Sequence, residues 1–408
     1  MKKICHYYLI VLLLQGCSKD PMIINTPKIG ELELSWQTAL REDNQYSPTA
    51  NNPPIILNDD IAFFYDAVEE QEKILFVSKI DHTVNRFFNQ IQGNIKQSFF
   101  HQGVGLLAID YENIFVGSNA DAMKILSTVP ENLSFGANNN LVGDYLYMDD
   151  RNENTRTNYI YQVNVNSGEL NYYEIIRDDQ YSDYDKVSIL TPYDCIIGAD
   201  TFFINNILKL KNNFGKFDVI NINKSTKETL WTKTNQKQGY SEFINYNNTM
   251  ICSGGDSLYC LKPLTGEKVW ATPYIFTRDW KGWVPKNMLL VGDKLTLLDQ
   301  GHYVEINAKN GNILYDSPEL FLAQTNSKIN YFEGVFYWTA AGTDAYSYLF
   351  GLRASDKKMV VKMKSPNAAK FNNETNFDWN GIQIDPETRL GYTTDGFYAM
   401  CFKIPENY

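Results

Sequence analysis

Hydrophobic and polar residues alternate with a period of two along most of this chain. Residues 159–175 and 258–272, for example, each contain an apolar strand-like segment, a short polar turn and a second segment with a bulky aromatic residue. Such alternation is typical of β-strands that bury one face. Amphipathic stretches with the 3.6-residue period of a helix are almost absent, so the pattern predicts an all-β protein.

The same arrangement recurs along the chain. Its closing aromatic residues include Trp231, Trp270 and Tyr315, which are 39 and 45 positions apart. Two further short apolar segments precede each pair, so the unit has four strands. Repeats of ~40–50 residues with four strands are typical of β-propeller blades. Copies of the pair occur at residues 74–90, 159–175, 217–233, 258–272, 303–317 and 348–363.

The two ends of the chain predict how the ring closes. Residues 31–40 form a lone strand that contains Trp36, and residues 379–404 supply three strands. Pairing the two ends completes one blade and removes the open sheet edges. Eight blades are predicted, with seven as the alternative because the unit at residues 100–127 is faint. The predicted outermost strands lie near Phe87, Leu126, Tyr172, Trp231, Trp270, Tyr315, Val360 and Trp36.

The N-terminus is typical of a lipoprotein signal. Two lysines precede an apolar run at residues 4–14, which is too short to cross a bilayer and suits a signal peptide. The following "LQGC" resembles the bacterial lipobox, so we expect lipidation at Cys17; an ordinary secretory signal is the alternative. The predicted organisation is a signal peptide at 1–16, a lipid-anchored linker at 17–30 and one propeller domain at 31–408.

The repeat resembles a known family. The segment "SLYCLKPLTGEKVW" at residues 257–270 is similar to the repeat of PQQ-like, quinoprotein-type β-propellers, which also builds the BamB family of outer-membrane assembly lipoproteins. This resemblance covers residues 31–404. It implies that glycines such as Gly168, Gly266 and Gly311 tighten the turn between the third and fourth strands, because Gly adopts positive φ cheaply. It also implies that the following Trp packs on the next blade.

Composition narrows the chemistry. A net charge of −11 argues against nucleic-acid binding, and 44% hydrophobic residues suffice for a core. Quinoprotein dehydrogenases carry adjacent cysteines, but this chain has no Cys-Cys dipeptide, so we expect no cofactor. Cys252 and Cys260 flank a turn and would face each other for only one of two turn lengths. We favour buried free thiols, because Cys260 occupies a small core position.

No catalytic or metal-ligating constellation is evident. His82, His101 and His302 are predicted to be exposed residues of turns or loops, and neither a GxSxG nor an HExxH motif occurs. No cysteine and histidine spacing is typical of a zinc site. The sequence therefore predicts no catalytic residue and no metal.

Candidate partner contacts lie in loops on one face of the disc. Acidic segments at residues 66–73, 149–158 and 177–186 would bind Ca²⁺ or a basic peptide, although solvated surface is the simpler interpretation. The insertion at residues 205–216 is a further predicted contact loop. The candidate contact residues are Trp280, Arg278, Trp283, Asp178, Asp179 and Tyr181, with Trp280 as the anchor.

These features predict a lipid-anchored protein of the bacterial outer membrane, on the periplasmic side or the cell surface. Its monomeric body would be a non-catalytic platform for an envelope or outer-membrane protein or peptide, with outer-membrane protein assembly as a special case. The alternative is a surface enzyme or carbohydrate-binding protein with a calcium or quinone site on the propeller face.

Overall fold

The structure is a computed structural model, and only part of the chain is described. The described residues are 30–40, 53–65, 74–87, 95, 97–110, 112–128, 139–152, 157–177, 183–184, 186–197, 200–211, 214–223, 225–226, 228–236, 241–254, 257–273, 288–299, 301–321, 327–344, 346–371, 375, 377 and 381–406. Throughout these residues the regular elements are β-strands, with no helix. Consequently none of them forms a helix that is long and apolar enough to cross a membrane.

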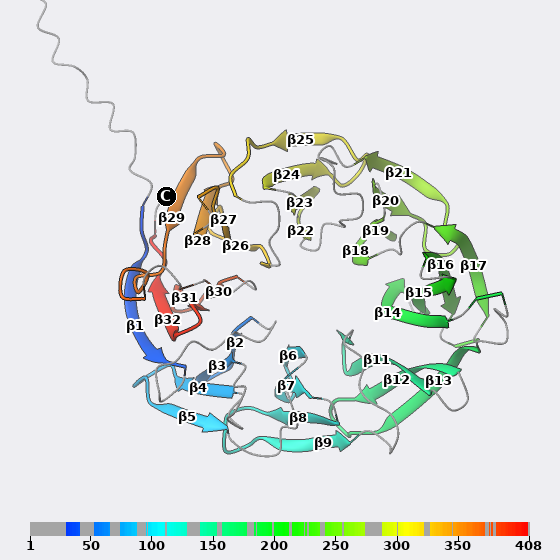
Figure 1. Ribbon diagram of the computed structural model, residues 1–408, viewed down its shortest axis with the longest axis horizontal. Coiled ribbons are helices and arrows are strands. Elements are labelled where there is room, and N and C mark those ends of the chain that lie inside the picture. The colour runs from blue at the N-terminus through cyan, green and yellow to red at the C-terminus, as the bar shows by residue number, and fades with distance from the viewer. Residues whose placement is uncertain are drawn as a thin grey trace, which may run out of the picture.

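Eight four-stranded antiparallel sheets stand around a central axis and form a β-propeller (Figure 1). In each blade the first strand lies nearest the axis and the fourth lies outermost. Blades 1 to 4 are β2 (Ile55–Ile56), β3 (Asp60–Phe64), β4 (Ile74–Ser78) and β5 (Val84–Phe87); β6 (Gln97–His101), β7 (Gly105–Ile109), β8 (Asn113–Gly117) and β9 (Lys124–Thr128); β10 (Asn139–Val142), β11 (Tyr145–Asn152), β12 (Thr157–Asn164) and β13 (Leu170–Arg177); β14 (Lys186–Ile197), β15 (Asp200–Lys211), β16 (Phe214–Asn223) and β17 (Thr229–Gln236).

Blades 5 to 8 continue the ring in the same order. They are β18 (Ser241–Tyr246), β19 (Thr249–Ser253), β20 (Ser257–Leu261) and β21 (Lys268–Pro273); β22 (Met288–Val291), β23 (Lys294–Asp299), β24 (His302–Asn307) and β25 (Ile313–Asp316); β26 (Asn330–Phe332), β27 (Val335–Ala341), β28 (Ser347–Arg353) and β29 (Met359–Met363); β30 (Gln383–Asp385), β31 (Leu390–Thr394), β32 (Tyr398–Lys403) and β1 (Glu33–Ala39). The faint unit at residues 100–127 belongs to a complete blade, so the eight-bladed prediction is confirmed and the seven-bladed alternative is wrong.

The N-terminal strand closes the ring as the sequence predicts. β1 pairs with β32, with Trp36 opposite Cys401, so the last blade combines both ends of the chain. Each predicted outermost position falls on the fourth strand of its blade, from Phe87 on β5 to Val360 on β29. Before β1, the Gly30 N–H donates to the Val360 carbonyl of blade 7 at 2.8 Å, which ties the entering chain to the preceding blade.

Buried side chains fill the spaces between the blades. Neighbouring sheets face each other, and an apolar cluster lies at each of the eight interfaces. At the closing interface, for example, Tyr392 and Cys401 of blade 8 pack with Phe63 and Val77 of blade 1. Because each strand alternates, its two sets of side chains serve the two flanking interfaces. This explains why both sets are apolar in the middle strands of a blade.

The outer turns join blade to blade. In blade 5 the turn places Gly266 at φ +66°, and its missing Cβ would lie 2.8 Å from Cδ2 of Trp231 in blade 4. The Trp231 Nε1–H donates to the carbonyl of Pro263 in that turn at 2.6 Å. Blade 6 repeats the contact with Gly311 against Trp270, whose Nε1–H donates to the Ala308 carbonyl at 3.0 Å. The predicted packing of Trp on the next blade is therefore present at these two interfaces.

Other interfaces keep the contact with different residues. His82 occupies the corresponding turn position in blade 1 at φ +58°, and its ring lies 5.2 Å from that of Trp36. Lys357 occupies it in blade 7 at φ +61°, with its Nζ 5.8 Å from the ring of Tyr315 in blade 6. Tyr172 differs, because it is 67% exposed and its ring packs against Tyr159 and Tyr161 of its own blade.

Two predicted loops are largely strand, so those predictions are wrong. The insertion at residues 205–216 lies in β15 and β16, which pair from Phe202 to Lys211 as one long hairpin. The lengthened hairpin has its own small core, in which Val187 and Ile207 are buried. Within it, Lys209 and Asp218 form a buried ion pair at 2.7 Å. Likewise residues 149–152 and 157–158 belong to β11 and β12.

The contact between the outer turns and the aromatic residues can be tested with two glycines. In Gly266→Ala the new methyl group must displace the Trp231 indole, whereas in Gly292→Ala it meets nothing within 4 Å at a similar φ of +60°. Both variants carry the left-handed backbone cost of about 1 kcal/mol. We expect Gly266→Ala to lose a further ~1–3 kcal/mol from overpacking, measured by urea unfolding. Equal losses in the two variants would contradict this role of the turn.

Candidate functional site

The six predicted contact residues, Trp280, Arg278, Trp283, Asp178, Asp179 and Tyr181, lie outside the described residues, as does the lipidation site Cys17. Their roles remain predictions.

The strand order assigns each turn to one of the two faces of the disc. The turns between the second and third strands and the connections between blades lie on one face, which we call the loop face. It includes Glu112 and His302. First-to-second and third-to-fourth turns share the opposite, turn face, which includes Gln102 and Gly266.

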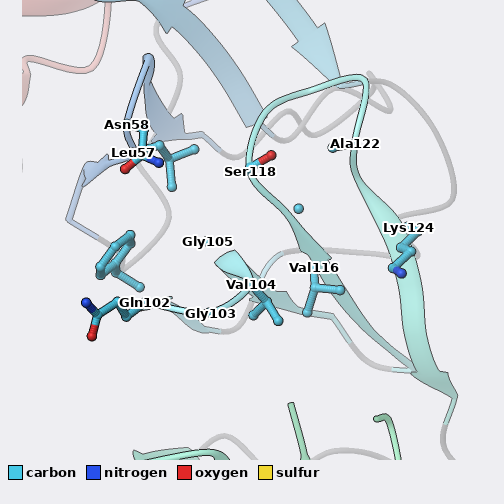
Figure 2. Close-up of a pocket in the computed structure, with 12 residues that line it drawn as sticks. Leu57, Asn58, Gln102, Gly103, Val104, Gly105, Val116, Ser118, Ala122 and Lys124 are labelled. Carbon is cyan, nitrogen blue, oxygen red and sulfur yellow. The ribbon is translucent and has the colours of Figure 1, made fainter. Parts of the chain in front are cut away.

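Two adjoining hollows open on the turn face. One, of about 360 Å³, lies between blades 1 and 2 (Figure 2). The other, of about 650 Å³, lies between blades 2 and 3. Phe100, Gln102 and Gly103, from the end of β6 and the turn that follows, line both hollows and separate them. Figure 2 shows Leu57 and Asn58 of blade 1 across the first opening from this segment.

The separating segment, residues 100–103, is fixed by hydrogen bonds and exposes an aromatic side chain to solvent. The Gly103 N–H donates to His101 Nδ1 at 3.1 Å, so Nδ1 is an acceptor and the proton resides on Nε2. His101 Nε2 therefore donates to Asp144 Oδ1 of blade 3 at 3.0 Å. Beside this anchored ring, the Phe100 side chain is 50% exposed. The arrangement presents an aromatic ring on a fixed support, which suits binding better than proton transfer.

The other two histidines are also engaged in structural contacts. His82 is exposed as predicted, but it lies against Trp36. His302 Nδ1 lies 2.5 Å from the Ser317 carbonyl and 3.2 Å from Asp316 Oδ1. The side chains of His101 and His302 are only 11% and 19% exposed, so the prediction of exposed histidines is wrong for these two.

Carboxylates gather beside the first hollow. Asp59 follows Asn58 in the turn of blade 1 and Asp60 begins β3, while Asp81 and Asp121 lie in the outer turns of blades 1 and 2. Burial and the like charges of Asp59, Asp121 and Asp81 raise the pKa of Asp60. Hydrogen bonds from Ser78 and Thr83 lower the pKa of Asp81 to about 2, so that carboxylate is ionised at neutral pH. Asn58 and Ala122, which line the hollow, are the chain neighbours of Asp59 and Asp121, so negative charge adjoins its rim, while Lys124 is the charged residue of the lining itself.

Metal and thiol chemistry find little support in the described part of the chain. No cluster of three or more His, Cys, Asp or Glu residues there could hold a metal ion. Cys252 pairs with Tyr259, and Cys260 with Ile251, so the two thiols point to opposite faces of their sheet. Both are buried and free, which confirms that prediction. Burial raises the pKa of each thiol, so neither is a reactive thiolate.

A strongly perturbed carboxyl group lies on the loop face. Asp299 ends β23 and is 7% exposed. Burial raises its pKa to about 6, although the neighbouring His302 opposes the shift. Isolated burial of this kind weakens the fold at neutral pH, because the ionised form loses its hydration.

Comparison with known proteins identifies the architecture and leaves the function open. No family model matches the chain, and its sequence matches none of the curated proteins. Among solved structures it is similar to the computationally designed protein Ika8, with 8% identity, a TM-score of 0.59, and 88% of this chain and 97% of that chain covered. It is also similar to BamB from Moraxella catarrhalis, with 10% identity, a TM-score of 0.56, and 91% and 100% covered. The chain has the fold of a BamB-like β-propeller. At this identity the likeness concerns the fold alone.

Sequence reasoning missed the turn-face hollows. Their lining residues come from short polar turns of three blades, such as Gln102, Ser118 and Asn166, where no periodic signal exists. The one available signal is Phe100 directly before "HQG", a large aromatic residue that enters a turn. Whether such a ring is buried or exposed depends on the neighbouring blades, so the sequence alone leaves it undecided.

The perturbed Asp299 predicts a pH-dependent stability. Its pKa is raised, so its contribution to stability is present below pH ~4 and is lost as pH rises towards 6. Asp299→Asn should match the parent near pH 4 and exceed it by up to about 3 kcal/mol at pH 7.5. Urea unfolding at both pH values measures this. Asp293→Asn should behave oppositely, because Lys309 and Tyr246 lower the pKa of Asp293. A pH-independent gain for Asp299→Asn would contradict the assignment.

Proposed function

We propose that this protein is a non-catalytic, protein-binding β-propeller anchored by lipid at Cys17 to the bacterial outer membrane. The observation that carries the binding role is the exposed Phe100 ring between two hollows, on a segment fixed to the next blade through His101 and Asp144. Rigid, partly exposed aromatic side chains beside hollows are typical anchors of protein interfaces.

The catalytic alternative has no comparable support among the described residues. Each of the three histidines that follow the predicted signal peptide is engaged with a neighbour: His82 with Trp36, His101 with Asp144, and His302 with Ser317. A general base needs a nitrogen that faces substrate. Their geometry therefore favours a structural role for the histidines and a binding role for the surface.

The proposed anchor would reach the disc at its outer wall. β1 begins at Glu33, opposite Lys403, at the turn face, and it ends near Phe397 at the loop face. Before β1, however, Gly30 pairs in parallel with Val361 of β29, the outermost strand of blade 7, so a tether would enter along the outer wall. The linker at residues 18–29 would reach at most about 40 Å. A lipid at Cys17 would hold this point of entry within that distance of the membrane, where a membrane-bound partner is accessible.

The likeness to BamB propellers suggests the kind of partner. We propose that the repeat is of the PQQ-like type and serves as a structural frame without a quinone. Outer-membrane protein assembly is the special case of this function that the BamB-like fold favours. The partner would then be another envelope protein that meets the turn face.

The lipid anchor predicts a simple fractionation result. Cys17→Ala should shift the protein from the membrane fraction to the soluble envelope fraction, because stable attachment requires more than one acyl chain. Cys5→Ala, within the predicted signal peptide, should leave the protein in the membrane fraction. Membrane retention of Cys17→Ala after washing with high salt would contradict the anchor.

The binding role can be tested by site-specific photo-crosslinking in the native envelope. A photoreactive residue at Gln102, between the hollows, should crosslink to one defined envelope protein, identified by mass spectrometry. The same residue at Glu112, on the loop face of the same blade, is the matched control and should not crosslink to that protein. Adducts of equal yield at both positions, or none at Gln102, would contradict a partner at the turn face.

A further inference from the structure

The turn face of blades 1 to 3 combines an apolar anchor with an uneven distribution of charge. The turns that surround the two hollows, together with the strand ends that adjoin them, contain six carboxylates but only two lysines, and all of these residues are described. Charge of one sign around a hollow attracts and orients a partner of the opposite sign. The carboxylates are Asp59, Asp60, Asp81, Asp121, Asp144 and Glu169, and the lysines are Lys79 and Lys124.

One of the two lysines is already neutralised within the protein. Lys79 Nζ lies 2.9 Å from Asp385 Oδ2 of blade 8 and 3.2 Å from the Leu57 carbonyl, so its charge supports the closing interface. Lys124 lines the first hollow on the side away from Asn58 (Figure 2). Among the described residues of these turns and the strand ends that adjoin them, Lys124 is therefore the one lysine left to balance Asp59, Asp60, Asp81 and Asp121.

The carboxylates on this rim also repel each other. Burial, followed by the like charges of Asp59, Asp121 and Asp81, raises the pKa of Asp60. Repulsion of this kind is relieved when a cation approaches. The first hollow has an apolar component as well, because Leu57, Val104 and Val116 join Phe100 in its lining. Its volume of about 360 Å³ is at the lower end of that of known ligand sites and suits a large side chain.

We propose that the partner segment that docks on this surface is a cationic stretch of polypeptide. One large apolar side chain of the segment enters the hollow beside Phe100, and flanking Lys or Arg residues meet the aspartates of the rim. This inference rests on the proposed function and specifies the chemistry of the partner. An acidic segment would be repelled, and a purely apolar one would leave the aspartates without counter-charges when the interface excludes water.

The test uses the folded chain and a defined probe. The probe is a dye-labelled peptide with two Lys residues on each side of a Phe, followed by fluorescence anisotropy at 50 and 300 mM NaCl. Matched probes replace every Lys by Glu or the Phe by Ala. We expect measurable binding only for the basic probe that contains Phe, weakened at least fivefold by the higher salt concentration.

Protein variants then locate the site. Phe100→Ala and the double variant Asp60→Asn with Asp121→Asn should each weaken binding at least fivefold. Tyr172→Ala removes an exposed aromatic ring from the outer wall, and Glu112→Gln removes an exposed carboxylate from the loop face of blade 2. Both controls should bind as the parent does. Thermal unfolding of each variant shows whether its fold is intact, and a loss of binding counts only for variants that retain the parent's transition.

The outcomes separate this inference from the proposed function. Binding of the acidic probe with equal strength would overturn the inference. So would an affinity for the basic probe that is unchanged in both the Phe100→Ala variant and the double aspartate variant. If crosslinking from Gln102 identifies a partner whose attached segment is acidic, the binding platform stands and the cationic assignment falls. If no partner crosslinks from Gln102 while the probe still binds at Phe100, the chemistry of the surface stands and the proposed cellular role falls.

Discussion

The structure depends on the pairing of β1 with β32, which joins the two ends of the chain in one blade. A ring of separate sheets has no covalent link at its last interface, so the ladder between these strands must supply it. The closing blade uses the same contact as blades 4 and 5. Trp36 of β1 meets His82 in the outer turn of blade 1, as Trp231 meets Gly266 further round. The closing interface is therefore packed like the continuous ones.

The residue at the outer-turn position adapts to its aromatic neighbour. Gly266 leaves room for the flat face of an indole, and a methyl group there would overlap it. His82 and Lys357 accept the same left-handed backbone and fill the space differently, by a ring contact and by a cation over a ring. The outer turn must pack closely against the aromatic ring of the preceding blade, and glycine is one of the residues that allow this. This explains why the repeat is recognisable in blades that lack glycine at this position.

The sequence predicted the ring well, because its signal is local and repeated. Alternation, turn glycines and closing aromatics recur with every blade, and Trp36 marks a fourth strand that lacks its own third strand nearby. The insertion at residues 205–216 was predicted wrongly because Asn and Lys are rare in strands. Here these residues extend the antiparallel pairing of β15 with β16. The buried ion pair of Lys209 with Asp218 compensates for their polar composition. Local propensity carries no information about such a pairing.

The binding surface was harder to predict for a related reason. A propeller separates the residues that build it from those available for binding: the strands carry a periodic pattern, and the turns do not. Phe100 lies near the end of β6, Asp60 begins β3 and Asp121 lies in an outer turn, and they gather only after blades 1 and 2 have packed side by side. The same separation leaves much of the turn surface free to vary, apart from contacts such as those with the outer aromatics and the ion pair of Lys79 with Asp385. The charges of Asp59, Asp60 and Asp121 are therefore not required by these contacts. Like-charged aspartates around a hollow oppose folding slightly, and a cationic partner that meets them would convert that cost into affinity.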